Sequence, residues 1–207
     1  MISVDDHAEN SIVVASGANM LLNEQDVDKV VEEMCEGDIL LMQLEIPIQT
    51  VEYAARKAFE KGVKVVLNPA PARSLPKELL RYLFMITPNR IEAEMLTGIK
   101  IVNDADAERV AKEISAMGVQ NIIVTLGSKG CLVREGDTSY CVDAFKVEPV
   151  DTTAAGDTFN GALCVGLAEG MNLRQSAGMA SKASSVAVTR MGAQSSIPYR
   201  KELDLNE

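Results

Sequence analysis

Short apolar runs of strand length alternate with segments of helical periodicity along almost the whole of this 207-residue chain. Strands that are apolar throughout are typical of sheets buried on both faces, and a helix between successive strands is typical of parallel connections. The sequence therefore predicts a single α/β domain over residues 1–207, with a mostly parallel sheet covered by helices. The predicted strands span residues 39–44, 63–67, 83–86 and 121–126, followed by an antiparallel excursion at 131–134 and 138–142. The predicted helices begin near residues 23, 49, 77, 90, 103, 156 and 173, with Asn23 and either Asn103 or Asp104 as N-caps.

Composition and charge exclude several classes of function. The formal net charge of −10 repels polyanions, so we expect no nucleic-acid partner and no attachment to acidic membrane surfaces. No apolar run is long enough to span a bilayer and residues 1–7 lack the pattern of a leader, so we expect a cytoplasmic protein. His7 is the only histidine, so a general base must be a carboxylate. The four cysteines form no C-x-x-C pair, which indicates reduced core thiols rather than a zinc or redox site.

A loop of small residues runs directly into a predicted helix at residues 150–162 and carries one carboxylate. The start of a helix presents backbone N–H groups and the positive end of its dipole. Small side chains at Ala154, Ala155 and Gly156 let an anion approach these groups, and Asp157 then lies within reach of a hydroxyl held beside the anion. This pattern suits phosphoryl transfer to an alcohol. The alternative is an ordinary helix start with a favourable first-turn charge.

Polar groups follow several predicted strands at their C-terminal ends. Glu45, Asn68, Asn89 and the pair Gly127-Ser128 each occupy such a position. Parallel α/β sheets bind ligands beyond the carboxyl ends of their strands, so these groups predict a ligand cleft. For Glu45 the alternative is the first-turn acid of the following helix.

Asn89 and Glu92 form an N-x-x-E pair at a predicted helix start, which places both side chains on the same side of the first turn. The carboxylate can orient Mg²⁺ through water while the amide contacts phosphate oxygens. The alternative is a capping box. The glycine-containing turn at residues 125–130 matches neither a Walker loop nor a dinucleotide fingerprint, and its alternative is an ordinary strand-to-hairpin turn.

The sequence Asp-Thr-Thr-Ala-Ala-Gly-Asp at 151–157 resembles the D-T-x-[GA]-A-G-D signature of the ribokinase-like sugar kinases, also called PfkB carbohydrate kinases. Further stretches that resemble this family lie at 17–19, 68–73, 87–89 and 189–198, and they are most similar to its ribose kinases. The resemblance implies a ribokinase-like fold with helices on both faces of the sheet. It also implies ATP-dependent phosphorylation of a pentose, D-ribose to D-ribose 5-phosphate before others. In this family the residue matching Asp157 is the catalytic base.

The resemblance also implies a set of ligands for each bound group. Ala154, Ala155 and Gly156 form the anion hole, and Glu45 with Asp157 contacts the sugar. ATP is bound by Asn89, Thr125, Leu126, Gly127, Ser128, Lys129, Gly130, Gly156, Asp157 and Ser181, where Ser181 replaces a side chain that is often longer in the family. Mg²⁺ is held through water by Glu92. A K⁺ ion is enclosed, mainly by carbonyl oxygens, by Asp151, Thr153, Ala187, Arg190, Gly192 and Ser196.

Members of the family have a further N-terminal segment, with a sugar-binding region, a Gly-Gly-Lys loop and most of a small β lid, ahead of the point where this sequence begins. We therefore expect residues 1–15 to be a remnant of the lid, with residues 9–14 as a lid strand that lacks its partners. A homodimer through the lid would be weakened. Two functions follow as alternatives: an active sugar kinase, with fructokinase, deoxyribokinase and nucleoside kinase beside ribose kinase, or a truncated nucleotide-binding remnant without kinase activity.

Overall fold

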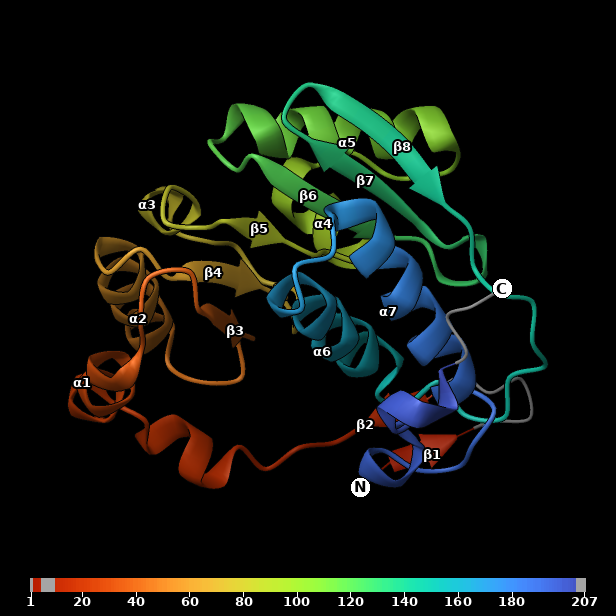
Figure 1. Cartoon of the computed structure of the whole chain (residues 1–207), viewed down its shortest axis with the longest axis horizontal. Coiled ribbons are helices and arrows are strands. Elements are labelled where there is room, and N and C mark those ends of the chain that lie inside the picture. Colours follow the sequence, from red (N-terminus) through yellow and green to blue (C-terminus); the bar gives the residue numbers. More distant parts are fainter. Residues whose placement is uncertain (1, 5–9, 204–207) are drawn as a thin grey trace. The chain divides into compact units, whose positions relative to one another are not determined.

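The computed structural model describes residues 2–4 and 10–203, which form two compact units whose elements are labelled in Figure 1. The sheet unit consists of residues 16–126 and 132–141. The helix-pair unit consists of residues 127–131 together with the described residues within 1–15 and 142–207. That residues 1–207 form one domain stays a prediction.

The sheet unit is built on a six-stranded sheet with the order β3-β4-β5-β6-β7-β8. The strands are β3 (Ile39–Met42), β4 (Lys64–Leu67), β5 (Met85–Ile86), β6 (Asn121–Thr125), β7 (Cys131–Glu135) and β8 (Thr138–Val142). Registers that run in the same direction from β3 to β6 make these four strands parallel. Only Gly136 and Asp137 connect β7 to β8, and so short a connection joins antiparallel strands. The predicted parallel sheet and its antiparallel excursion are confirmed.

The first strand of the sheet departs from its prediction. β3 ends at Met42 rather than at residue 44, and Leu41 is 38% exposed although the sequence predicts a buried strand. The reason is the position of β3 at the edge of the sheet, where β4 is its neighbour. In the inner strands, burial on both faces is confirmed: Val66 and Leu67 are successive residues of β4, so they point to opposite faces, and both are fully buried.

Helices pack against one face of the sheet in an apolar core to which α2 contributes Val51 and Ala55. The helices of the sheet unit are α1 (Glu24–Glu33), α2 (Ile48–Glu60), α3 (Lys77–Leu80), α4 (Arg90–Thr97) and α5 (Asp104–Ala116), with the 3-10 helix η1 (Gly17–Leu21) ahead of them. Asn23 and Asn103 cap α1 and α5 through reciprocal capping boxes. The prediction of Asn23 is therefore confirmed, and Asn103 rather than Asp104 is the cap of α5.

The helix-pair unit contains α6 (Ala155–Ala168) and α7 (Leu173–Ala187), which lie side by side (Figure 1). Gly166 permits their close contact, because a Cβ added to it would lie 3.1 Å from the Cα of Ser176. The unit also contains the 3-10 helices η2 (Gly127–Lys129), η3 (Gln194–Ser196) and η4 (Arg200–Glu202).

Two short N-terminal strands, β1 (Ile2–Val4) and β2 (Asn10–Ile12), pair in antiparallel fashion. The sequence predicts a lid strand within residues 9–14 that lacks its partners from the N-terminal segment of the family. β2 lies within that range and pairs with β1. That it lacks the other strands of the lid stays a prediction. That residues 1–15 are a lid remnant stays a prediction, and residues 1 and 5–9 lie outside the described part of the chain.

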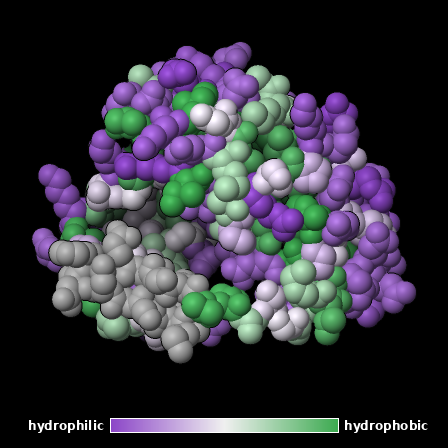
Figure 2. Space-filling model, turned by 180° about the vertical axis from the view of Figure 1, so that it is seen from behind, coloured by the Kyte–Doolittle hydropathy of each residue, from purple (hydrophilic) through white to green (hydrophobic). Residues whose placement is uncertain are grey.

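Hydrophilic side chains cover most of the face seen in Figure 2, with hydrophobic side chains in separate groups. Among the described residues, no helix combines the length and the apolar character that crossing a membrane requires. All four cysteines are free thiols, but only Cys131 is buried, whereas Cys35 and Cys141 are exposed. The prediction of core thiols is therefore wrong for these two, because Cys141 lies on the edge strand β8 and Cys35 lies just beyond the end of α1.

Candidate active site

Polar residues line the carboxyl edge of the parallel strands in the sheet unit, as the sequence predicts. Asn68 directly follows β4 and is buried, and its N–H donates to the carbonyl of Met42 in β3 (2.9 Å). Asn89 follows β5 and forms a parallel bridge with Thr125 of β6. Glu45 follows β3 and is exposed. Because adjacent parallel strands end at the same edge, these groups form one row along it.

The Asn89–Glu92 pair forms a complete capping box at the start of α4. Asn89 Oδ1 accepts the N–H of Glu92 (3.0 Å), and Glu92 Oε2 accepts the N–H of Asn89 (2.8 Å). Asn89 Nδ2 donates to Glu92 Oε1 (2.8 Å), so both carboxylate oxygens accept a hydrogen bond. Burial raises the pKa of Glu92, and the backbone hydrogen bond from Asn89 opposes this shift. The capping interpretation therefore describes the geometry, and a metal-bound water would use the remaining lone pairs of the carboxylate.

Arg90 adds a contact at this edge that the sequence does not predict. Its Nη2 donates to the carbonyl of Leu126 at 3.0 Å, which joins the first residue of α4 to the residue after β6. Leu126 is one of the residues that the resemblance assigns to ATP. An arginine at the first position of a helix carries no pattern that points to a partner 36 residues further along the chain.

The predicted glycine turn ends in a close backbone approach. Residues 127–130 form η2 and a turn in which the N–H of Gly130 donates to the carbonyl of Gly127 (2.9 Å). Gly130 has φ +85°, and a Cβ added there would collide with the backbone of Val142 and Ala144. Only glycine fits at this position. Gly127, Ser128, Lys129 and Gly130 thus form a defined turn, whereas Thr125 and Leu126 belong to the sheet unit.

The small-residue loop leads into α6 at Ala155, one residue earlier than predicted. Its N-cap residue, Ala154, has φ +59°, in the left-handed region, and provides no side-chain cap. The N–H of Ala155 donates to the carbonyl of Thr152 (3.2 Å), so this amide closes a turn and already has a hydrogen-bond partner within the protein. Within the described residues, the N–H of Gly156 makes no hydrogen bond. Gly156 and Asp157 are both exposed.

Asp151 connects this loop to the segment after α7. Its Oδ1 accepts the N–H of Thr153 and its Oδ2 accepts the N–H of Gly192, both at 2.9 Å. Hydrogen bonds from Thr153 and then from Gly192 hold the pKa of Asp151 below its usual range. Three of the six residues assigned to K⁺ are therefore joined through one carboxylate that is 2% exposed.

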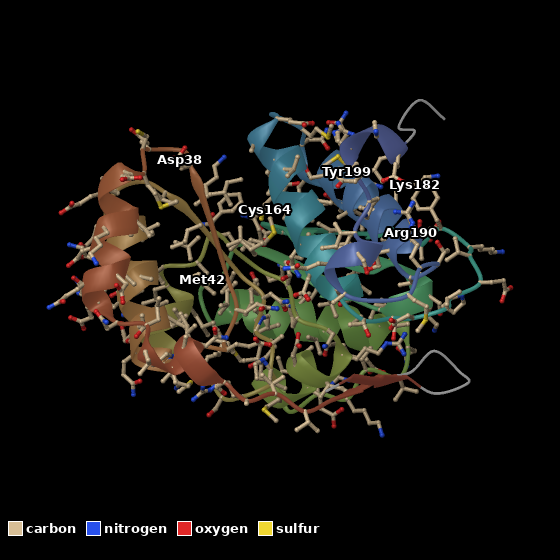
Figure 3. All side chains as sticks on the ribbon, turned by 90° about the horizontal axis from the view of Figure 1, so that it is seen from below. Asp38, Met42, Cys164, Lys182, Arg190 and Tyr199 are labelled. Carbon is tan, nitrogen blue, oxygen red and sulfur yellow. The ribbon has the colours of Figure 1, made fainter. Side chains whose placement is uncertain are left out.

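The other residues assigned to K⁺ lie at the end of α7 and just beyond it. Ala187 and Ser196 are fully buried, and Ser196 Oγ donates to the carbonyl of Ala193 (2.7 Å). Arg190, labelled with Tyr199 in Figure 3, forms an ion pair with Glu202 (2.7 Å). Among the described residues, no three His, Cys, Asp or Glu side chains gather as metal ligands. A cation here would therefore depend on carbonyl and hydroxyl oxygens.

Helix α7 carries one residue predicted for ATP and two contacts that the sequence does not predict. Ser181 is buried, with 7% of its surface exposed. Its neighbour Lys182, labelled in Figure 3, places Nζ 4.7 Å from the centre of the Phe145 ring. Ser184 Oγ donates to the carbonyl of Ala155 in the first turn of α6 (3.1 Å). Serines within a helix rich in small residues give no sequence signal for such a contact.

The comparisons with known proteins agree with these features. Residues 1–200 match the family described as pfkB family carbohydrate kinase. A ribokinase from Haemophilus influenzae is 45% identical over 201 residues, which are 97% of this chain and 66% of the relative. The chain thus spans about two thirds of the length of such relatives.

Solved structures give the same result for the fold. The crystal structure of a ribokinase from Thermotoga maritima matches with a TM-score of 0.85 at 39% identity, over 98% of this chain and 66% of that one. An Arabidopsis thaliana ribokinase complexed with ribose and ATP matches with a TM-score of 0.86 at 30% identity, again over 98% and 66%. These matches confirm the ribokinase-like α/β fold. The chain belongs to the pfkB family of carbohydrate kinases.

Proposed function

We propose that this chain transfers the γ-phosphoryl group of ATP to a hydroxyl of D-ribose and so forms D-ribose 5-phosphate and ADP. The observation that carries this proposal is the start of α6, where the exposed carboxylate of Asp157 lies next to the exposed backbone of Gly156. The similarity to ribokinases over nearly the whole chain supports ribose as the sugar.

In this reaction Asp157 accepts the proton of the attacking sugar hydroxyl. A sugar hydroxyl is too weak an acid to ionise beforehand, so the proton moves late, as the new bond between the sugar oxygen and the γ-phosphorus forms. The bond between that phosphorus and the β–γ bridging oxygen breaks, and its electrons leave with ADP. An exposed carboxylate in the first turn of a helix is accessible to a substrate, which supports this role for Asp157.

The start of α6 stabilises the negative charge on the transferring group. The N–H of Gly156 and the positive end of the helix dipole provide the fixed donors that such a group requires. Ala154 and Ala155 contribute small side chains that leave the backbone accessible. Because the N–H of Ala155 already donates to Thr152, we assign the main amide contact to Gly156.

We assign the nucleotide and the sugar to the residues that match the family's motifs. Glu45 contacts ribose. Asn89, residues 125–130 and Ser181 contact ATP. Their places at strand ends, in the glycine turn and on α7 support the assignment, because strand ends and turns of this type form ligand sites in α/β folds.

The same motifs assign two cations. Glu92 would orient Mg²⁺ through water, and its two hydrogen-bonded oxygens keep lone pairs for that purpose. Asp151, Thr153, Ala187, Arg190, Gly192 and Ser196 would hold K⁺ through carbonyl and side-chain oxygens. When bound, Mg²⁺ supplies charge neutralisation at the phosphates and K⁺ supports the shape of the loop. The bond from Gly192 to Asp151 supports the second assignment, since it already joins two parts of that set.

We further propose that the chain acts in the cytoplasm, where ATP and sugar phosphates occur, and binds no nucleic acid or membrane. The net charge of −10 and the four free cysteines support this setting. A homodimer through the β1–β2 region is the corresponding proposal for assembly.

The test is ADP formation by the purified chain with Mg²⁺, K⁺ and ATP, on D-ribose, 2-deoxyribose and fructose. We expect the highest turnover on D-ribose and a loss of about 10²–10⁴-fold in D157A. Equal turnover in D157A would remove Asp157 from the mechanism. Titration calorimetry with Mg·ATP distinguishes the second interpretation, because binding without turnover on any sugar would identify a nucleotide-binding protein.

A further inference from the structure

We propose that Ser184 positions the anion-binding first turn of α6 for catalysis without contacting either substrate. The inference rests on the proposed function and adds a residue to it. Ser184 lies on α7, 29 residues from Ala155, and its Oγ donates to the carbonyl of Ala155 at 3.1 Å. Ser184 is not among the site residues that the resemblance to the family implies.

Two side chains donate hydrogen bonds to carbonyl groups in the first turn of α6, and they belong to different helices. Asn160 Nδ2 donates to the carbonyl of Gly156 (2.9 Å), but Asn160 belongs to α6 and moves with it. Ser184 belongs to α7. Its hydroxyl therefore fixes the first turn of α6 relative to the neighbouring helix, which a bond within one helix cannot do.

The bond lies next to a backbone conformation that needs support. Ala154 has φ +59°, and the left-handed region is unfavourable for a residue with a Cβ. Such conformations persist where the surroundings hold both sides. On the N-terminal side, Asp151 accepts the N–H of Gly192. On the C-terminal side, the carbonyl of Ala155 accepts from Ser184.

The donors of both hydrogen bonds, Ser184 and Gly192, lie on α7 or in the segment that follows it. They therefore hold the loop against the same part of the unit. The peptide that carries the Ala155 carbonyl also carries the N–H of Gly156, because these two groups belong to the same planar unit. A hydrogen bond to that carbonyl therefore sets the direction of the N–H that we assign to the transferring phosphoryl group. Ser184 acts on the reaction through this one peptide plane.

The experiment compares S184A with S185A. Ser185 is the matched control, because it is the next residue of α7 and its Oγ donates to the carbonyl of Lys182 within its own helix. With D-ribose and Mg·ATP we expect S184A to lower kcat about threefold to tenfold, the effect of one hydrogen bond, with the KM for ribose unchanged. S185A should keep the wild-type kcat, and S184T should restore most of the loss because it keeps the hydroxyl.

The unfolding temperature separates this role from a purely structural one. Under the proposal, S184A should unfold at the same or a higher temperature than the wild type, because alanine has a higher helix propensity than serine. A lower kcat together with a lower Tm, shared by S185A, would contradict the proposal. So would an S184A variant with the wild-type kcat.

A second measurement separates this inference from the proposed function. The ¹⁵N relaxation order parameter of the Gly156 amide reports its rigidity without any turnover. We expect a lower value in S184A and the wild-type value in S185A and S184T. If the wild type phosphorylates no sugar, the proposed function fails while this comparison still decides the role of Ser184. Equal order parameters in all four proteins would overturn it.

Discussion

The helix starts at α4 and α6 both place an acid in the first turn, yet they satisfy their backbone groups in different ways. At α4, Asn89 and Glu92 bond to each other through side chain and backbone at 2.8–3.0 Å, and Glu92 is 5% exposed. At α6, Ala154 gives no side-chain cap and Asp157 is exposed.

This difference separates a helix start that is capped by a side chain from one that has no side-chain cap. The first N–H groups of a helix need a partner, from a side chain, water or a bound molecule. The starts of α1, α4, α5 and α7 obtain that partner from an asparagine in a capping box. At the start of α6 the N–H of Ala155 donates to the carbonyl of Thr152, whereas the N–H of Gly156 is left to solvent or to an anion, which agrees with its proposed role in phosphoryl transfer.

The largest effect on kcat should come from placing a side chain on Gly156, next to the amide that we assign to the transferring phosphoryl group. A Cβ on Gly156 or on Gly161 meets no atom within 4 Å, so the first side-chain carbon has room at both sites. We expect G156V to lower kcat by about 10²–10³-fold, because its side chain excludes the anion from the amide. G161V, in the same helix, should keep full activity, and neither variant should lose stability, since glycine is the poorer helix former. Equal activities of the two variants would contradict the assignment.

The next effect concerns the left-handed residue at the α6 start. A154V places a β-branched residue at φ +59° and should lower the free energy of unfolding by about 1–2 kcal/mol in urea denaturation. A154G should stay within about 0.5 kcal/mol of the wild type, because relief of strain and the greater freedom of the unfolded chain offset each other. If A154V proved as stable as A154G, the loop would not be held in this conformation.

Removing a cap at a structural helix start should affect stability alone. N103A deletes the capping box of α5, and we expect a loss of about 1 kcal/mol in the free energy of unfolding with unchanged kcat. Urea denaturation and the ADP assay on the same preparation measure both. A fall in kcat without a change in stability would break the division between the two kinds of helix start.

Glu92 and Asp151, two buried carboxylates of the described residues, should respond to pH in opposite ways. Burial raises the pKa of Glu92 above its ordinary 4.5, so its contribution to stability is present below that value and is lost as the pH rises through the folded pKa. Hydrogen bonds from Thr153 and Gly192 lower the pKa of Asp151 below 3.8, so its contribution is present above 3.8 and is lost as the pH falls. Urea denaturation over a pH series measures both against neutral variants.

Relative to E92Q, the wild type should lose stability as the pH rises above about 4.5. Relative to D151N, its advantage should stay constant there and shrink only below about pH 3.8. Parallel pH profiles for the two pairs would show that the environments of Glu92 and Asp151 do not differ as the geometry indicates.

Local patterns in the sequence predict much of this fold and part of the site. Apolar runs locate the parallel strands, and Asn23 and Asn103 mark helix starts because a cap depends on residues three positions apart. The row of Glu45, Asn68 and Asn89 follows from strand ends alone. In these cases the determining contacts are close in sequence.

Features that depend on distant contacts could not be predicted in this way. The exposure of Leu41 depends on the order of strands in the sheet, which puts β3 at the edge. The bonds from Arg90 to Leu126 and from Ser184 to Ala155 join residues 36 and 29 positions apart. The positive φ of Ala154 could not be predicted either, because glycine and asparagine, not alanine, are the residue types that usually indicate it.

The most direct test of the central claim is an amide NMR titration of the wild-type chain with Mg·ATP. The account predicts that the N–H signal of Gly156 shifts strongly on binding. The N–H signal of Asp106, which donates to Asn103 Oδ1 in the capped start of α5, should stay in place. A titration that saturates with the Gly156 signal unmoved would show that the start of α6 does not bind the phosphates.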